Sequence, residues 1–147
     1  MKTLALVATL LVAATLGLAA DKKPLAGPKG GKLLENSAPR AEFFIEKDNR
    51  VTITFYDEQL KPVPAGEQVV LLTAEPKTGK VKLTLEKKDG VLVSSQPLPN
   101  GGKADEYQIT LQIKAKADAK PQNFRLRFDL DICEKCKRKE YACICDQ

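Results

Sequence analysis

The stretch F-R-L-R-F-D-L-D-I, residues 124–132, alternates apolar and charged side chains without a break. Successive side chains of a β-strand point to opposite faces, so this alternation predicts a strand with one face in a core and the other in water. The residues predicted to face inward are Phe124, Leu126, Phe128, Leu130 and Ile132. Those predicted to face outward are Arg125, Arg127, Asp129 and Asp131.

The remaining chain carries further short apolar runs, most of them with the same period of two. Phe43 and Ile45 share one predicted face, and Val51, Ile53 and Phe55 share another. The predicted strands upstream of the first one lie at residues 43–45, 51–56, 69–74, 81–86, 91–95 and 107–113. With the strand at 124–132 this makes about seven, separated by turn residues at short intervals.

Three of the segments between and within these strands allow sharper predictions. Asp48–Asn49 is a tight connection, which predicts a β-hairpin between the first two strands. The segment 61–67, KPVPAGE, holds two prolines and a glycine and is predicted to be irregular. The run VVLLTA, residues 69–74, is continuously apolar, which predicts a strand buried on both faces.

Short antiparallel strands without helical periodicity are typical of an all-β, two-sheet sandwich of the immunoglobulin or cupredoxin-like type. An open barrel is the alternative. All four cysteines follow the last predicted strand, so no disulfide can link the two sheets and apolar packing must hold them. The expected fold is therefore a sandwich with a C-terminal cysteine knuckle.

Residues 1–20 have the pattern of a secretory signal peptide. Lys2 precedes an apolar run from Leu4, and small residues follow near the end of the run. Cleavage after Ala19 fits the small-residue positions better than cleavage after Ala20, and an uncleaved membrane anchor is the alternative. We therefore expect an exported protein, periplasmic or extracellular, with no membrane span after signal cleavage.

The chain after the signal divides into three predicted parts. Residues 21–32 are rich in Lys, Gly and Pro and are expected to form a flexible lead. Residues 33–132 hold the predicted strands and form one domain of ordinary size. Residues 133–147 form a four-cysteine tail.

Composition excludes several classes of function. The chain has no histidine, which removes every catalytic triad that uses imidazole as its base and every histidine-ligated metal site. Loss of Lys2 lowers the formal charge from +5 to +4, and the cations do not form the dense stripe of a nucleic-acid binder. A non-enzymatic protein without a nucleic-acid partner is expected.

The tail carries the spacing C-x2-C-x6-C-x-C, formed by Cys133, Cys136, Cys143 and Cys145. A C-x2-C turn lets two thiolates converge on one ion, and a second close pair completes the tetrahedral sulfur shell that structural Zn²⁺ prefers. Soft thiolates also suit Cu(I). The cations expected to offset the thiolate charge are Lys135, Lys137, Arg138 and Lys139, and Asp131 or Glu134 could add an oxygen nearby.

Two other interpretations of the cysteines remain open. Export favours disulfides, and crossed pairings such as Cys133–Cys143 with Cys136–Cys145 avoid the very tight ring of a Cys143–Cys145 bridge. Thiol redox chemistry at Cys133 and Cys136 would normally accompany a βαβ pattern, which the sequence lacks. Strict alternation from residue 124 places Cys133 on the outward, solvent side, and Tyr141 is expected to pack over the knuckle.

The stretch AEFFIEKDNRVTITFYDEQLKPVPAGE, residues 41–67, resembles small periplasmic domains found beside or within heavy-metal efflux systems. Those domains are similar to sandwich-type copper chaperones. The resemblance implies metal handling in the cell envelope, with the cysteine tail in place of the usual ligands and an envelope protein as a partner. A structural or adaptor sandwich with a disulfide-stapled tail is the competing class.

Overall fold

A computed structural model describes residues 25–99 and 106–145, and the predicted signal peptide at 1–20 lies outside these ranges. The described chain is all-β, with ten strands and one 3-10 helix. The elements are β1 (Lys32–Leu34), β2 (Arg40–Ile45), β3 (Val51–Tyr56), β4 (Pro62–Val63), β5 (Val69–Glu75), β6 (Val81–Leu83), β7 (Leu85–Lys88), β8 (Val91–Ser94), β9 (Tyr107–Lys114), β10 (Gln122–Phe128) and η1 (Glu140–Ala142).

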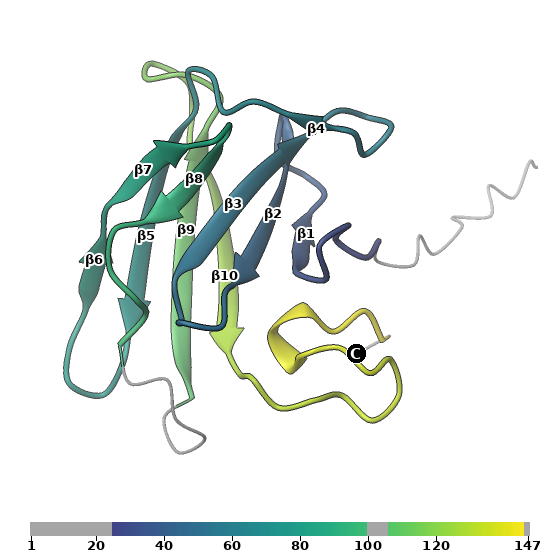
Figure 1. Cartoon of the computed structure of the whole chain (residues 1–147). Helices are drawn as coiled ribbons and strands as arrows, with labels where there is room; N and C mark the ends of the chain where they lie inside the picture. Colours follow the sequence, from purple (N-terminus) through teal and green to yellow (C-terminus); the bar gives the residue numbers. More distant parts are fainter. Residues whose placement is uncertain (1–24, 100–105, 146–147) are drawn as a thin grey trace, which may run out of the picture.

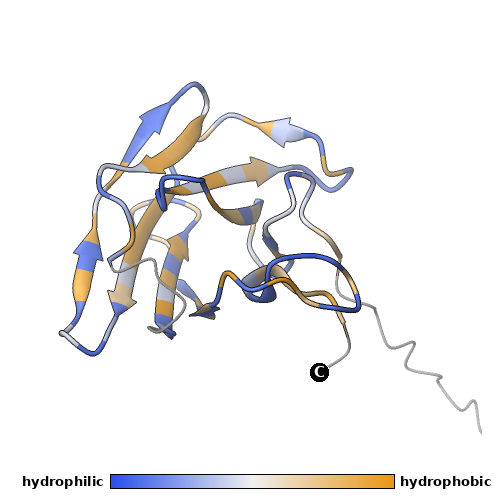
Figure 2. Ribbon diagram, turned by 60° about the horizontal axis from the view of Figure 1, so that its bottom comes forward, coloured by the Kyte–Doolittle hydropathy of each residue, from blue (hydrophilic) through white to orange (hydrophobic). Residues whose placement is uncertain are grey.

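The strands form two antiparallel sheets that pack face to face, as predicted (Figure 1). One sheet has the order β1-β2-β3-β8-β7, with β4 paired to β3, and the other has the order β10-β9-β5-β6. The core between them contains the inward residues of every long strand, among them Phe43, Phe55 and Ile109. Hydrophobic and hydrophilic bands alternate along the strands, which reflects the period of two in the sequence (Figure 2).

The predicted hairpin joins β2 to β3, with Ile45 opposite Val51. Its turn closes with hydrogen bonds from the Glu46 N–H to the Arg50 carbonyl and from the Asn49 N–H to the Glu46 carbonyl. Asn49 has a φ of 62°, a left-handed conformation that asparagine tolerates better than most residues. The dipeptide Asp48–Asn49 was therefore enough to predict this turn.

The number of strands is ten rather than seven, for three local reasons. β1 begins at the last residue of the predicted lead and continues to Leu34, where no strand was predicted, and β4 lies within the segment predicted to be irregular. Proline at the start of a two-residue edge strand costs little, because its missing N–H would face away from the ladder. The predicted strand 81–86 is divided at Thr84, so that β6 belongs to one sheet and β7 to the other.

The prediction that residues 69–74 are buried on both faces is wrong. In β5, Leu72 and Ala74 are buried, whereas Leu71 is 54% exposed. β5 lies between β9 and β6, and its outer face carries no covering layer of described chain. Only one face of β5 therefore packs in the core.

Residues 25–31, part of the predicted flexible lead, wrap around a buried carboxylate. Glu42 is 0% exposed. Its carboxylate accepts hydrogen bonds from the backbone N–H of Gly31 (2.7 Å) and Lys29 (3.0 Å) and from the hydroxyl of Tyr56 (2.6 Å). A buried carboxylate needs such donors, so Glu42 fixes the path of this segment. No helix in the described ranges is long and apolar enough to cross a membrane.

Candidate metal centre

The segment that leads from β10 into the tail begins at Asp129. The Asp129 carboxylate accepts the backbone N–H of Asp131 at 3.0 Å, a local side-chain contact that competes with strand pairing. The period of two therefore stops at Phe128, the end of β10. Ile132 is 57% exposed and Cys133 is 7% exposed, so the predictions of an inward Ile132 and a solvent-facing Cys133 are both wrong.

The first cysteine pair lies in a tight knuckle closed by backbone hydrogen bonds. Ile132 and Lys139 form an isolated antiparallel bridge. Within it the Cys133 N–H donates to the Arg138 carbonyl at 2.7 Å, and the Lys137 N–H donates to the Cys133 carbonyl at 2.9 Å. The second bond closes the turn that contains Cys133 and Cys136, and the φ of 58° at Lys137 then turns the chain back toward Lys139.

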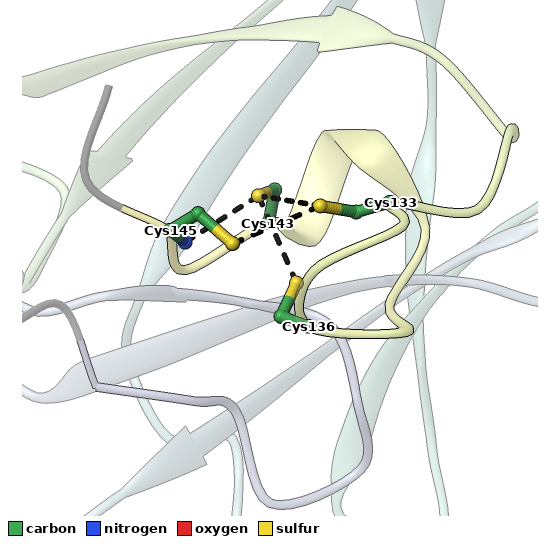
Figure 3. Close-up of side chains that lie close together, drawn as sticks. All are labelled: Cys133, Cys136, Cys143 and Cys145. Atoms are coloured by element: carbon green, nitrogen blue, oxygen red, sulfur yellow. Dashed lines mark hydrogen bonds between the residues drawn. The ribbon is translucent and has the colours of Figure 1, made fainter.

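The second pair is brought to the first by η1. The Glu140 N–H donates to the Asp131 carbonyl, and the Tyr141 N–H donates to the Asp129 carbonyl. The 3-10 turn then closes with the Cys143 N–H on the Glu140 carbonyl at 3.1 Å. Because the chain folds back on residues 129–131, Cys143 and Cys145 face the knuckle (Figure 3).

The four sulfur atoms form a compact group, with every Sγ within 4.8 Å of every other (Figure 3). Cys143 and Cys133 are 3.5 Å apart, and the pairs Cys133–Cys145 and Cys136–Cys143 are each 3.7 Å apart. A tetrahedron of sulfurs at about 2.3 Å from a central ion has edges of about 3.8 Å. The four sulfur atoms could therefore bind one metal ion with little movement of their side chains.

All four cysteines are free thiols in the structure. The shortest Sγ–Sγ distance, 3.5 Å, is well beyond the bond of about 2.05 Å in a disulfide. Cys133 lies at this range from both Cys143 and Cys145, and Cys143 from both Cys133 and Cys136, as a shared centre requires. Two separate bridges would instead bring each sulfur close to a single partner.

The cluster has two buried and two half-buried thiols, and their pKa values differ. Cys133 and Cys143 are buried, whereas Cys136 and Cys145 are half-buried. The backbone N–H groups of Ile144 and Arg138 lower the pKa of Cys136 to about 6. Burial, followed by hydrogen bonds to neighbouring thiols, raises the pKa of Cys145 to about 12.

Cys143 feels opposing influences. The backbone N–H of Cys145, 3.4 Å from the sulfur, lowers the pKa of Cys143. The hydrogen bond to Cys133 and burial raise this pKa by more, so the net shift is upward. A metal ion would replace these shared protons with its own charge. The group is therefore suited to take up a cation and release protons.

The residues predicted to surround the ligands contribute through the backbone more than through their charges. The Asp131 carbonyl fixes η1, the Lys137 N–H closes the knuckle and the Arg138 N–H acts on Cys136. Lys139 pairs with Ile132, and Lys135 is exposed at the turn.

Two residues position the site in ways that the sequence did not predict: Lys32 was missed, and Tyr141 was predicted to pack over the knuckle. Tyr141 is 5% exposed and makes an edge-to-face contact with Phe43, with ring centroids 5.8 Å apart. The ammonium of Lys32 in β1 donates to the Cys143 carbonyl at 3.1 Å. Tyr141 thus enters the sandwich core rather than covering the knuckle, and the tail lies against the β1 side of the molecule (Figure 1). The only sequence signal was a lone aromatic residue within a charged loop.

Comparison with protein-family models, with curated proteins and with solved structures gave no match.

Proposed function

We propose that this chain is an exported, non-enzymatic protein that binds one soft metal ion through Cys133, Cys136, Cys143 and Cys145. The observation that carries the proposal is the mutual proximity of four sulfurs, all within 4.8 Å. Such proximity is costly without an ion, because thiolates repel one another once they lose their protons. A central cation removes that cost.

Zn²⁺ is the first choice of metal, and Cu(I) is the second. Four thiolates at tetrahedral spacing match the structural sites of Zn²⁺. Cu(I) shares the preference for soft sulfur ligands but does not require four of them. With all four positions supplied by the protein, no coordination site remains for a substrate, which supports a binding or structural role over catalysis.

Cations in the tail support the same proposal. Four thiolates around Zn²⁺ carry a net charge of about −2. Lys137, Arg138 and Lys139 lie in the loop between the two cysteine pairs, Lys135 lies within the first pair, and all four would offset that charge. The signal-like segment at 1–20 and the resemblance of residues 41–67 to domains of heavy-metal efflux systems are the support for metal handling in the envelope.

The test is metal analysis and thiol titration on protein purified from the export compartment. We expect about one Zn²⁺ or Cu(I) per chain and thiols that become reactive only after a chelator is added. Replacement of Zn²⁺ by Co²⁺ should give the intense visible and near-ultraviolet absorption of a tetrahedral thiolate site. Cys136→Ser should lower metal retention markedly.

Glu134→Gln is the matched control, because Glu134 lies within the same C-x2-C turn and is exposed. We expect this variant to keep its metal. Blocked thiols without any metal would overturn the proposal in favour of a disulfide-stapled structural or adaptor domain. A thiol pair that cycles with a physiological reductant while no metal is bound would instead indicate a redox protein.

A further inference from the structure

A groove runs between the edge strands of the two sheets, from the β1–β2 connection to the cysteine tail. It consists of two adjoining hollows of about 390 Å³ and about 370 Å³. Both are lined by Lys32 of β1 and by Arg125 and Leu126 of β10, so they are continuous. The second hollow ends at Glu140 and Cys143.

The edge of β10 along this groove is open to a further strand. Among the described residues, β10 pairs with β9 alone. β1 is less available, because Ala26 forms an isolated bridge with Lys32. At the far end the Gln122 side chain bonds to the Asn36 carbonyl and the Ala38 N–H, which closes the groove there. The accessible edge is therefore 123–128, long enough for one short strand.

The middle of the groove is positively charged. Arg125 and Arg127 are exposed on β10, and the half-buried Lys32, whose ammonium also donates to the Cys143 carbonyl, lines the groove from β1. Arg127 has an ion pair with Glu106, but both side chains are about half exposed or more, so a ligand can compete for it. Among the described residues that line the two hollows, the carboxylates are Glu35 toward one end and Glu140 toward the other, so the Glu106 paired with Arg127 is the acidic group beside the middle.

We propose that this groove binds an extended segment of a partner protein, with acidic side chains at its centre, which pairs with the edge of β10. Backbone pairing to an open strand edge supplies affinity that does not depend on sequence. The acidic side chains, placed at every second position, would meet Arg125, Arg127 and Lys32. The inference does not depend on whether the cysteines hold a metal.

The test uses a fluorescent peptide of about eight residues with alternating valine and glutamate. We expect binding to the full chain, weakened at least about tenfold by the double variant Arg125→Glu, Arg127→Glu and by raised salt. The matched control is Lys80→Glu, Lys82→Glu, which makes the same charge change at β6, the opposite edge strand of the same sheet. That control should bind within about twofold of the unchanged protein.

Two further measurements identify the mode of binding. A peptide of the same sequence with alternate amides N-methylated should bind at least about tenfold more weakly, because it cannot pair with a strand. Amide chemical shifts of the unchanged protein should move along β1 and β10, a result that does not depend on the folding of any variant.

Any of three results would overturn the proposal. The two charge variants could lose peptide affinity equally, the amide chemical-shift changes could be confined to β6 and β7, or the N-methylated peptide could bind as tightly as the unmethylated one. Binding of a sulfated polysaccharide in place of the peptide would also overturn it and would assign the groove to an anionic polymer. The metal content of the same variants is measured as well, so that a loss of peptide binding can be distinguished from a loss of the proposed metal site.

Discussion

The backbone N–H of Ile45 donates a hydrogen bond to the hydroxyl of Tyr141 at 3.0 Å, across 96 residues of sequence. Ile45 ends β2, and Tyr141 lies in η1 between the two cysteine pairs. Both residues are buried, so the bond is shielded from water. The cysteine tail is thereby part of the sandwich core, and events at the sulfurs are coupled to the stability of the sheet.

Tyr141→Phe should destabilise the protein without removing the aromatic contact to Phe43. The variant leaves the buried N–H of Ile45 without its acceptor, at a cost of about 1–3 kcal/mol in the free energy of unfolding. Urea denaturation measures this cost. Tyr107→Phe is the comparison, because the Tyr107 hydroxyl donates to the Pro99 carbonyl in a partly exposed position where water can replace it. A Tyr141 variant no less stable than the Tyr107 variant would contradict the coupling.

Removal of the metal should lower the melting temperature while the β-sheet signal persists at moderate temperature. An ion that binds only the folded state stabilises it by about 4 kcal/mol when its free concentration is about 1,000 times Kd. Thermal unfolding with Zn²⁺ and with a chelator measures the difference. In Cys136→Ser the two curves should nearly coincide. Identical curves for the unchanged protein would show that the tail docks without help from a metal.

Alkylation of the reduced, metal-free protein should modify Cys136 before Cys145. Thiolates are the reactive species, and the pKa of Cys136 is lowered to about 6 whereas that of Cys145 is raised to about 12. At neutral pH Cys136 is mostly thiolate, so its rate should fall only as the pH drops through about 6. Iodoacetamide labelling followed by peptide mass spectrometry gives the order. Faster labelling of Cys145 would contradict it.

Gly31→Ala should destabilise the fold, because the path of residues 25–31 is fixed by contact with β2. A Cβ at Gly31 would lie 2.2 Å from the Phe43 carbonyl oxygen, a backbone atom that cannot move aside easily. Overpacking of this kind costs about 1–3 kcal/mol. Gly66→Ala is the matched control, since its nearest atom is a flexible side-chain oxygen at 3.5 Å and a change within about 0.5 kcal/mol is expected. Equal stability of the two variants would indicate that residues 25–31 do not belong to the folded unit.

Several features of the fold could be predicted from local patterns. Alternation of Val51, Ile53 and Phe55 with polar residues identified β3, and Asn49 identified the turn before it. At residues 69–74 a local pattern gives a wrong prediction, because the continuous apolar run predicts burial on both faces. Leu71 is exposed because the second face of β5 has no partner layer in the described chain, and sequence composition does not report how many layers a fold has.

The division of strand 81–88 shows the same limit. Val81 and Leu83 pair in one sheet, whereas Leu85 pairs in the other. Nothing at Thr84 signals the change, because a single threonine continues the alternation that surrounds it. Sheet membership is decided by which neighbouring strand each half pairs with: Leu83 pairs with Leu72 of β5, the strand before it, and Leu85 pairs with Ser94 of β8, the strand after it.

The sequence by itself determined the all-β class, the two-sheet arrangement and the grouping of Cys133, Cys136, Cys143 and Cys145, because side-chain alternation and cysteine spacing are local properties. Tertiary structure alone decided that Cys133 is buried and that the tail docks through Tyr141. The Asp129 carboxylate accepts the Asp131 N–H, and the alternation of the strand ends there. The ring of Tyr141 packs in the core beside Phe43. The docking of Tyr141 depends on contacts with Phe43 and Ile45, far away in the chain, which no local pattern encodes.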